Sequence, residues 1–177
     1  MEQNMRFKEF YLTERPDTYT GISLGDDDIS HELEHLQKSK YKEYKDNNYT
    51  FRNYNDFVWF LFVDNVPAVM SKVSEKTTYA QILSTVTKKN MKNKGYATTL
   101  YEKLIEHYGG ILSDASLSKS RKGGSWFLYE KLIKKYPSYI VTWDYSKDHK
   151  KLTKTTSMPT ESNENRILVS KKDRSEL

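Results

Sequence analysis

The stretch that most limits the fold is Phe57–Val63, whose sequence FVWFLFV is almost continuously apolar. An apolar run of this length, without polar alternation, is typical of a strand that is covered on both faces. Asp64 and Asn65 then predict a turn, and Val66–Val73 predicts a returning strand. With Tyr79–Val86 as a third strand, we expect an antiparallel meander with packed layers on both sides.

The clearest helix follows this meander directly and starts near Gly95. Six apolar residues fall on one face of it at helical spacing: Ala97, Leu100, Tyr101, Leu104, Ile105 and Tyr108. Gly109 and Gly110 predict its end, and Ile111–Ser118 is expected to be the next strand. This order places Tyr79–Val86 and Ile111–Ser118 parallel to each other inside an otherwise antiparallel sheet, because a helix joins them.

The flanking segments complete the expected order of elements. We predict a first strand over Arg6–Leu12, a helix or helix pair from Gly25 to Tyr44 that ends at Asp46–Asn48, a helix over Gly124–Tyr136, strands over Tyr139–Trp143 and Ile167–Val169, and a polar hairpin loop over Ser146–Asn165. The fold class is therefore α/β (α+β): one domain over residues 1–170, with a mixed, mostly antiparallel sheet, helices on both faces and one βαβ crossover. Residues 171–177 are expected to be a flexible tail.

The composition narrows the class of protein. A chain of 177 residues with 14% aromatic side chains is long enough and apolar enough to bury a core, although 30% of its residues are charged. A net charge of +5 favours anionic partners such as nucleotides, nucleic acid or acyl-CoA. The absence of cysteine excludes disulfides, a thiol nucleophile and cysteine-ligated zinc. The N-terminus lacks the apolar core of a signal peptide and no apolar run matches a membrane span, so we expect a cytoplasmic protein.

The segment between the meander and the helix is Lys92-Asn93-Lys94-Gly95-Tyr96-Ala97. At the end of a strand that turns into a helix, free N–H groups and the helix dipole favour an anion. Gly95 allows the backbone to approach a phosphate closely, and Lys92 and Lys94 add positive charge. The alternative interpretation is a charged loop that precedes a helix and binds nothing.

These residues resemble the signature turn of the GNAT superfamily of N-acetyltransferases, which is Arg or Gln, two residues, Gly, one residue, then Gly or Ala. Here Lys92 stands in the first place. The resemblance implies that the turn wraps the pyrophosphate of acetyl-CoA with backbone amides, and that the preceding strand lies along the cofactor. The implied cofactor-binding residues are Ser84, Thr85, Val86, Lys92, Asn93, Lys94, Gly95, Tyr96, Ala97 and Thr98.

The second GNAT signature is a tyrosine followed by Glu-Lys in the next helix, and Tyr129-Glu130-Lys131 matches it. The resemblance implies that Tyr129 protonates the departing thiolate, a role that its hydroxyl can fill. The alternative for Tyr129 is a core tyrosine. Candidate general bases are Asp114 and Glu75, each of which has the alternative of a solvated surface carboxylate. The chain departs from the family at Lys122, where the family has Asn.

A rival motif is His31-Glu32-Leu33-Glu34-His35, which fits H-E-x-x-H. On a helix, two histidines four residues apart share a face, and together with Glu32 as general base they are typical of zinc hydrolases. A third ligand is missing from the sequence pattern, because the other histidines are His107 and His149. We therefore expect no metal site.

The predicted function is transfer of an acetyl group from acetyl-CoA to an amine acceptor by direct attack. The alternative is a non-catalytic binding protein of the same fold, a viral or mobile-element factor that acts on a host protein or nucleic acid. Ser113-Asp114 followed by a helix with Trp126 is similar to phage- or prophage-encoded GNAT-like proteins, which would place the chain in the host cytoplasm. We expect a monomer or homodimer without membrane contact.

Overall fold

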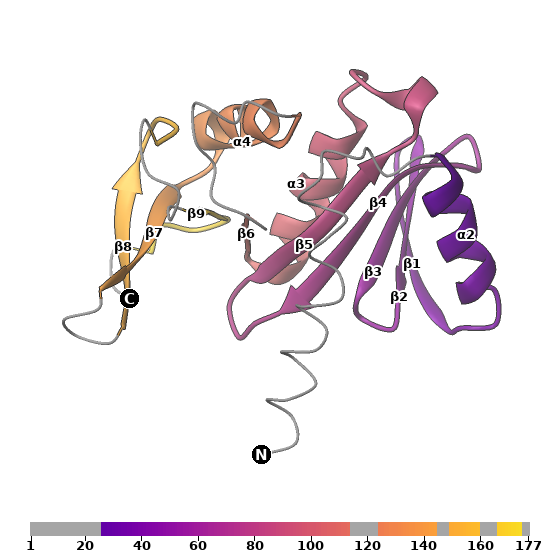
Figure 1. Ribbon diagram of the computed structural model, residues 1–177, viewed down its shortest axis with the longest axis horizontal. Coiled ribbons are helices and arrows are strands. Elements are labelled where there is room, and N and C mark those ends of the chain that lie inside the picture. Colours follow the sequence, from indigo (N-terminus) through magenta and orange to yellow (C-terminus); the bar gives the residue numbers. More distant parts are fainter. Residues whose placement is uncertain (1–25, 114–123, 145–148, 160–165, 175–177) are drawn as a thin grey trace, which may run out of the picture.

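The computed structural model describes residues 26–113, 124–144, 149–159 and 166–174. Within this part of the chain, one sheet of nine strands has the order β1-β2-β3-β4-β5-β6-β9-β7-β8 (Figure 1). Neighbouring strands are antiparallel except β5 and β6, which are parallel and joined through helix α3. The predicted mixed, mostly antiparallel sheet with one βαβ crossover is confirmed.

The helices and strands have the following bounds. The α-helices are α2 (Asp26–Leu36), α3 (Tyr96–Tyr108) and α4 (Gly124–Lys135), and a short 3-10 helix, η1, spans Lys89–Met91. The strands are β1 (Tyr41–Asp46), β2 (Tyr49–Tyr54), β3 (Val58–Val63), β4 (Val66–Glu75), β5 (Ala80–Thr87), β6 (Gly110–Leu112), β7 (Ser138–Asp144), β8 (His149–Thr155) and β9 (Arg166–Ser170). The predicted meander, the two long helices and the strands β7 and β9 are confirmed. The predicted first strand, Arg6–Leu12, lies outside the described residues.

Strand β3 is covered on both faces, as its sequence predicts. Trp59 and Leu61 point toward the core shared with α3 and α4, whereas Phe60 and Phe62 point toward α2. These four side chains are all buried. Because successive side chains of a strand point to opposite faces, helices are needed on both sides of β3, and α2 and α3 supply them (Figure 1).

The prediction of a helix or helix pair reaching Tyr44 is wrong beyond Leu36. The chain instead forms β1 and turns back into β2, with Asp46 opposite Tyr49. Tyr41 and Tyr44, three residues apart, imitate a helical stripe, but in the strand they face opposite sides of the sheet. Tyr41 packs against Tyr54, whereas Tyr44 stacks on Trp59 with ring centroids 5.5 Å apart.

The predicted loop over Ser146–Asn165 is also partly wrong, because it contains β8. This strand pairs with β7 along its whole length, from Thr155 opposite Ser138 to His149 opposite Asp144. It is an edge strand, with β7 as its one neighbour in the described sheet. Lysines on an edge strand discourage pairing with other chains, and this explains why a strand can have so polar a sequence. The predicted strand Ile111–Ser118 is described as β6 only up to Leu112, and its residues 114–118 lie outside the described part.

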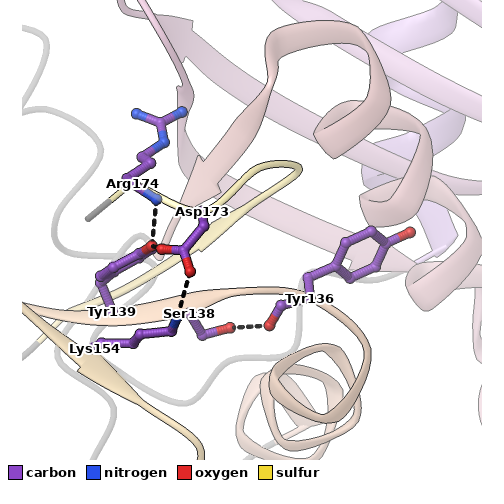
Figure 2. A network of polar contacts seen from close by, with 6 residues as sticks. All are labelled: Tyr136, Ser138, Tyr139, Lys154, Asp173 and Arg174. Carbon is purple, nitrogen blue, oxygen red and sulfur yellow. Dashed lines mark hydrogen bonds and ion pairs between the residues drawn. The ribbon is translucent and has the colours of Figure 1, made fainter. Parts of the chain in front are cut away.

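The C-terminal residues Asp173 and Arg174 contact three strands or turns that are separate in the sequence. The Tyr139 hydroxyl donates to Asp173 and accepts from the backbone N–H of Arg174, while Lys154 forms an ion pair with Asp173 (Figure 2). The Arg174 guanidinium donates to the Thr78 hydroxyl at 2.8 Å. These contacts connect the C-terminal residues to β7, β8 and the β4–β5 turn. The predicted domain boundary at residue 170 remains a prediction.

Gly110 begins β6 at a position with no room for a side chain. A Cβ atom added there would lie 2.8 Å from the Val169 carbonyl oxygen on β9 and 3.2 Å from the Arg174 guanidinium. We therefore expect Gly110→Ala to lower the free energy of unfolding by about 1–3 kcal/mol, since β6 and β9 must move apart. Urea denaturation measures this change. An unchanged free energy of unfolding in Gly110→Ala would contradict the prediction.

Among the described helices, none is both long enough and apolar enough to cross a membrane.

Candidate functional site

The parallel strands β5 and β6 pair only at their first residues and then separate. Their register covers two pairs, Ala80 with Ile111 and Gln81 with Leu112. The end of β6 is held by β9 instead: Ser113 N–H donates to the Ile167 carbonyl at 2.9 Å, and Ile167 N–H donates to the Ser113 hydroxyl at 3.1 Å. Beyond Gln81, β5 therefore has β4 as its one neighbour among the described strands.

The turn after β5 has the backbone geometry that a glycine-containing phosphate turn requires. Asn93 and Gly95 have φ angles of 63° and 84°, both in the left-handed region. Gly95 is the residue before α3, and its carbonyl accepts the Thr99 N–H at 3.0 Å. No side chain of the described chain caps this start of α3, and its first turn contains no acidic residue. The positive end of the helix dipole is thus available to an anion.

Positive charge surrounds this helix start. Lys92, Asn93, Lys94 and Gly95 are all exposed. Within the described part of the chain, no carboxylate forms an ion pair with Lys92 or Lys94. Two exposed lysines beside outward-facing backbone N–H groups suit a phosphate or diphosphate group.

The other predicted cofactor residues differ in what they offer to a ligand. Tyr96, Ala97 and Thr98, the first residues of α3, are half-buried, and the Tyr96 ring packs edge-on against Tyr49. Ser84 and Thr85 are half-buried in β5. Val86 is buried in the cluster beneath α2, so only its backbone is placed to meet a ligand on the α3 side.

A chain of hydroxyl groups joins β4, β5 and α3 beside this open edge. The Ser71 hydroxyl donates to the Ser84 carbonyl at 3.2 Å, and its oxygen lies 2.9 Å from the Thr85 hydroxyl. The Thr85 oxygen lies 2.8 Å from the Tyr101 hydroxyl. Because the Ser71 hydrogen is used on Ser84, Thr85 donates to Ser71, and Tyr101 donates to Thr85. This chain fixes the backbone of β5 at the residues predicted to lie along the cofactor.

The sequence gives no sign of this role for Ser71 or Tyr101. Tyr101 fits the apolar stripe of α3, and the pairing of Ser71 with Thr85 depends on the register of β4 and β5. That register includes a bulge, since Lys72 pairs with Ser84 but Val73 pairs with Ile82. A bulge inserts one extra residue into a strand, so counting along the sequence does not identify the partners.

Thr85→Val tests the hydroxyl chain, because valine keeps the shape of threonine but removes its hydrogen bonds. We expect the free energy of unfolding to fall by about 1–3 kcal/mol, as the Ser71 and Tyr101 hydroxyls each lose this partner. Thr87→Val, on the same strand and also half-buried, is the matched control and should change stability by no more than about 0.5 kcal/mol. Equal urea midpoints for the two variants would show that the hydrogen bonds among Ser71, Thr85 and Tyr101 do not stabilise the fold.

Tyr129, the predicted catalytic residue, lies on α4 and has 0% exposure. Its ring packs edge-on against Tyr101, with centroids 5.8 Å apart. Tyr129 therefore contacts Tyr101, and the Tyr101 hydroxyl in turn bonds the predicted cofactor residue Thr85. It is also a member of the main core cluster, together with Leu132 and Ile133 of the same helix.

Of the two candidate bases, the structure describes only Glu75. Asp114 lies outside the described residues. Glu75 is exposed at the end of β4 and pairs in register with Ala80, five residues before Thr85 along β5, a separation of about 16 Å in an extended strand. An open concavity lined by residues 75–79 occupies that far end of the sheet. Nearby, desolvation lowers the pKa of His107, and the charge of Glu75 raises it by less.

The H-E-x-x-H motif lies on α2, on the opposite face of the sheet. Glu32, the general base that a zinc hydrolase would need, forms an ion pair with Lys72 of β4 at 3.1 Å. The described residues include no cluster of three or more histidine, cysteine, aspartate or glutamate side chains that could hold a metal ion. The described residues therefore do not assemble the arrangement of a zinc hydrolase.

Comparison with known proteins gives weak similarities to solved acetyltransferases. No protein-family model and no curated protein sequence matches the chain. The diaminobutyrate acetyltransferase of Paenibacillus lautus, solved with L-2,4-diaminobutyric acid and coenzyme A, is 14% identical over 66% of this chain and 71% of its own, with a TM-score of 0.43. The ribosomal-protein-S18-alanine N-acetyltransferase of Escherichia coli is 12% identical over 88% of this chain and 96% of its own, with a TM-score of 0.38. Similarities at this level carry no argument about function.

Proposed function

We propose that the chain is a GNAT-type N-acetyltransferase that uses acetyl-CoA as acyl donor. The observation that carries the proposal is the continuity between two features: the open edge of β5 beyond Gln81 and the uncapped, lysine-flanked start of α3 at Gly95. An extended acyl-CoA needs both, because its pantetheine arm is a chain of amides and its diphosphate is an anion. No other place in the described structure combines an open strand edge with an anion-binding helix start.

The residues present fit acetyl-CoA in a simple way. The backbone of Ser84–Val86 offers hydrogen bonds to the pantetheine amides, as a strand edge does for an added strand. The diphosphate lies on the backbone N–H groups of the Gly95 turn, with Lys92 and Lys94 beside it. The hydroxyl chain through Thr85 keeps the β5 backbone in place for these contacts.

The reaction in this proposal is direct acyl transfer. The nitrogen of a neutral amine attacks the thioester carbonyl, a C–N bond forms, the C–S bond breaks, and CoA leaves as the thiol. Positioning of the two reactants and polarisation of the carbonyl by β5 N–H groups supply most of the acceleration. Tyr129 supplies the proton for the sulfur. Asp114 takes the amine proton in this proposal, because Glu75, the other candidate base, lies at the far end of β5 from Thr85.

A second candidate is a non-catalytic binding protein of the same fold, and the complete burial of Tyr129 favours it. In this case Tyr129 acts only as a core residue. The basic chain, with its net charge of +5, would bind an acidic host protein or nucleic acid, as suits a phage-encoded factor. Binding to nucleic acid would weaken steeply as salt rises.

Thermal denaturation with acetyl-CoA tests the proposal. Acetyl-CoA at one hundred times its dissociation constant should stabilise the native state by about 2.7 kcal/mol, and NAD, a dinucleotide with a diphosphate but no pantetheine arm, should give a smaller shift. Absence of any shift at millimolar acetyl-CoA would overturn the acetyltransferase proposal and leave the binding protein.

A further inference from the structure

His31 and His35 face each other on the exposed surface of α2. Their Nε2 atoms are 3.2 Å apart, whereas their ring centroids are 4.3 Å apart. The nitrogen-bearing edges of the two rings are therefore turned toward one another. Both side chains are exposed, so a solute reaches them directly.

This separation is close to that of two ligands of one metal ion. Zinc–nitrogen bonds of about 2.0–2.1 Å at a tetrahedral angle place two ring nitrogens about 3.3–3.4 Å apart. The hydrogen bond between the rings uses one Nε2 lone pair and one Nε2–H. If both rings instead carry their proton on Nδ1, both Nε2 lone pairs are available to a cation.

We propose that His31 and His35 form a two-histidine site for a borderline divalent cation, with Zn²⁺ as the natural choice. The site differs from that of a zinc hydrolase in its chemistry. It has two protein ligands and leaves the other coordination positions to water, and Glu32, which the hydrolase motif needs as a base, is held by Lys72 on the sheet. Zinc here joins two turns of α2 and does no chemistry.

The helix holds the two histidines in place for this role. Ile29 and Leu36 are buried against the sheet and Leu33 packs beside them, so the backbone beneath the pair is fixed. His35 lies in the last turn of α2, where the negative end of the helix dipole favours a cation. Imidazole nitrogen is also a preferred ligand of Zn²⁺, Ni²⁺ and Cu²⁺.

Titration of the full-length chain with Zn²⁺ against a chromophoric zinc indicator tests the site. We expect one Zn²⁺ per chain, and we expect His31→Ala and His35→Ala each to weaken binding by at least the roughly 10–100-fold that loss of a supporting group causes. Lys38→Ala, at an exposed position in the turn directly after α2, is the control for surface changes close to the pair. His107→Gln is the control for loss of a histidine elsewhere.

Two results would overturn the proposal: no bound Zn²⁺ at millimolar metal, or unchanged affinity in the His31→Ala/His35→Ala double variant. Cu²⁺ gives a second readout, because its electron paramagnetic resonance spectrum shows coupling to the imidazole nitrogens that bind it. The spectrum should show two such nitrogens in the parent chain and one in each single variant. This test is independent of acetyl-CoA, so its outcome does not depend on the acetyltransferase proposal.

Discussion

Gly95→Glu should abolish the rise in melting temperature that acetyl-CoA causes. For a chain of 177 residues, stabilisation by about 2.7 kcal/mol at one hundred times the dissociation constant corresponds to a rise of roughly 5–10 °C. A glutamate at the start of α3 places a negative charge where the diphosphate must lie. If binding weakens a thousandfold, the same ligand concentration stabilises the variant by only about 0.06 kcal/mol.

Gly95→Ala separates the effect of charge from that of backbone strain. At φ 84° any side chain is strained, which destabilises the free protein by about 1–3 kcal/mol in both variants. The alanine adds no charge, and its Cβ meets no atom within 4 Å, so most of the acetyl-CoA shift should survive. An undiminished shift in Gly95→Glu would show that the diphosphate does not lie at this turn.

The interior elements of the fold are predictable from the sequence because their side-chain patterns are set by burial. Phe57–Val63 must be covered on both faces, and the apolar stripe that ends at Tyr108 fits only a helix. In both cases every residue of a long segment, or every third or fourth one, has to be apolar because it is buried, and this makes the pattern easy to see. The βαβ crossover follows, because the connection between β5 and β6 is a helix that must pack on the sheet.

The edge strands are not predictable in the same way. Strand β1 has mostly exposed side chains and β8 carries lysines, so neither shows the apolar alternation of a half-buried strand. Their position is decided by backbone pairing with β2 and β7 in hairpins, and backbone pairing leaves little trace in the pattern of apolar side chains. A polar edge also avoids association with other chains, and for this reason it is the least strand-like part of the sequence.

The candidate site also has one part that the sequence predicts and one part that it does not. The turn around Gly95 is visible in the sequence, because a glycine between lysines before a helix is a local pattern. The hydroxyl chain of Ser71, Thr85 and Tyr101 is not, since it needs the register across a bulge and the rotation of α3 over the sheet. Side chains that support a site from another element become evident only when the elements are assembled.

Tyr129→Phe decides whether this site is catalytic or only binds. The change removes one buried hydroxyl and keeps the ring that packs on Tyr101, so stability should fall by only about 1 kcal/mol. If Tyr129 protonates the leaving sulfur, kcat should fall at least about 100-fold. The shift in melting temperature with acetyl-CoA should be unchanged, because the hydroxyl acts in the transition state and adds nothing to ground-state binding.

The measurement needs an amine acceptor, found first by following CoA release from acetyl-CoA with a panel of amines. Tyr139→Phe is the matched control, because Tyr139 is a second buried tyrosine and lies on β7, away from the candidate site. Its hydroxyl donates to Asp173. The kcat of this variant should equal that of the parent chain. If both variants transfer acetyl groups at the parent rate, Tyr129 is a core residue and the proton reaches the sulfur from another group. If no amine in the panel releases CoA although acetyl-CoA stabilises the fold, the site binds the cofactor without using it, and the binding protein becomes the better account.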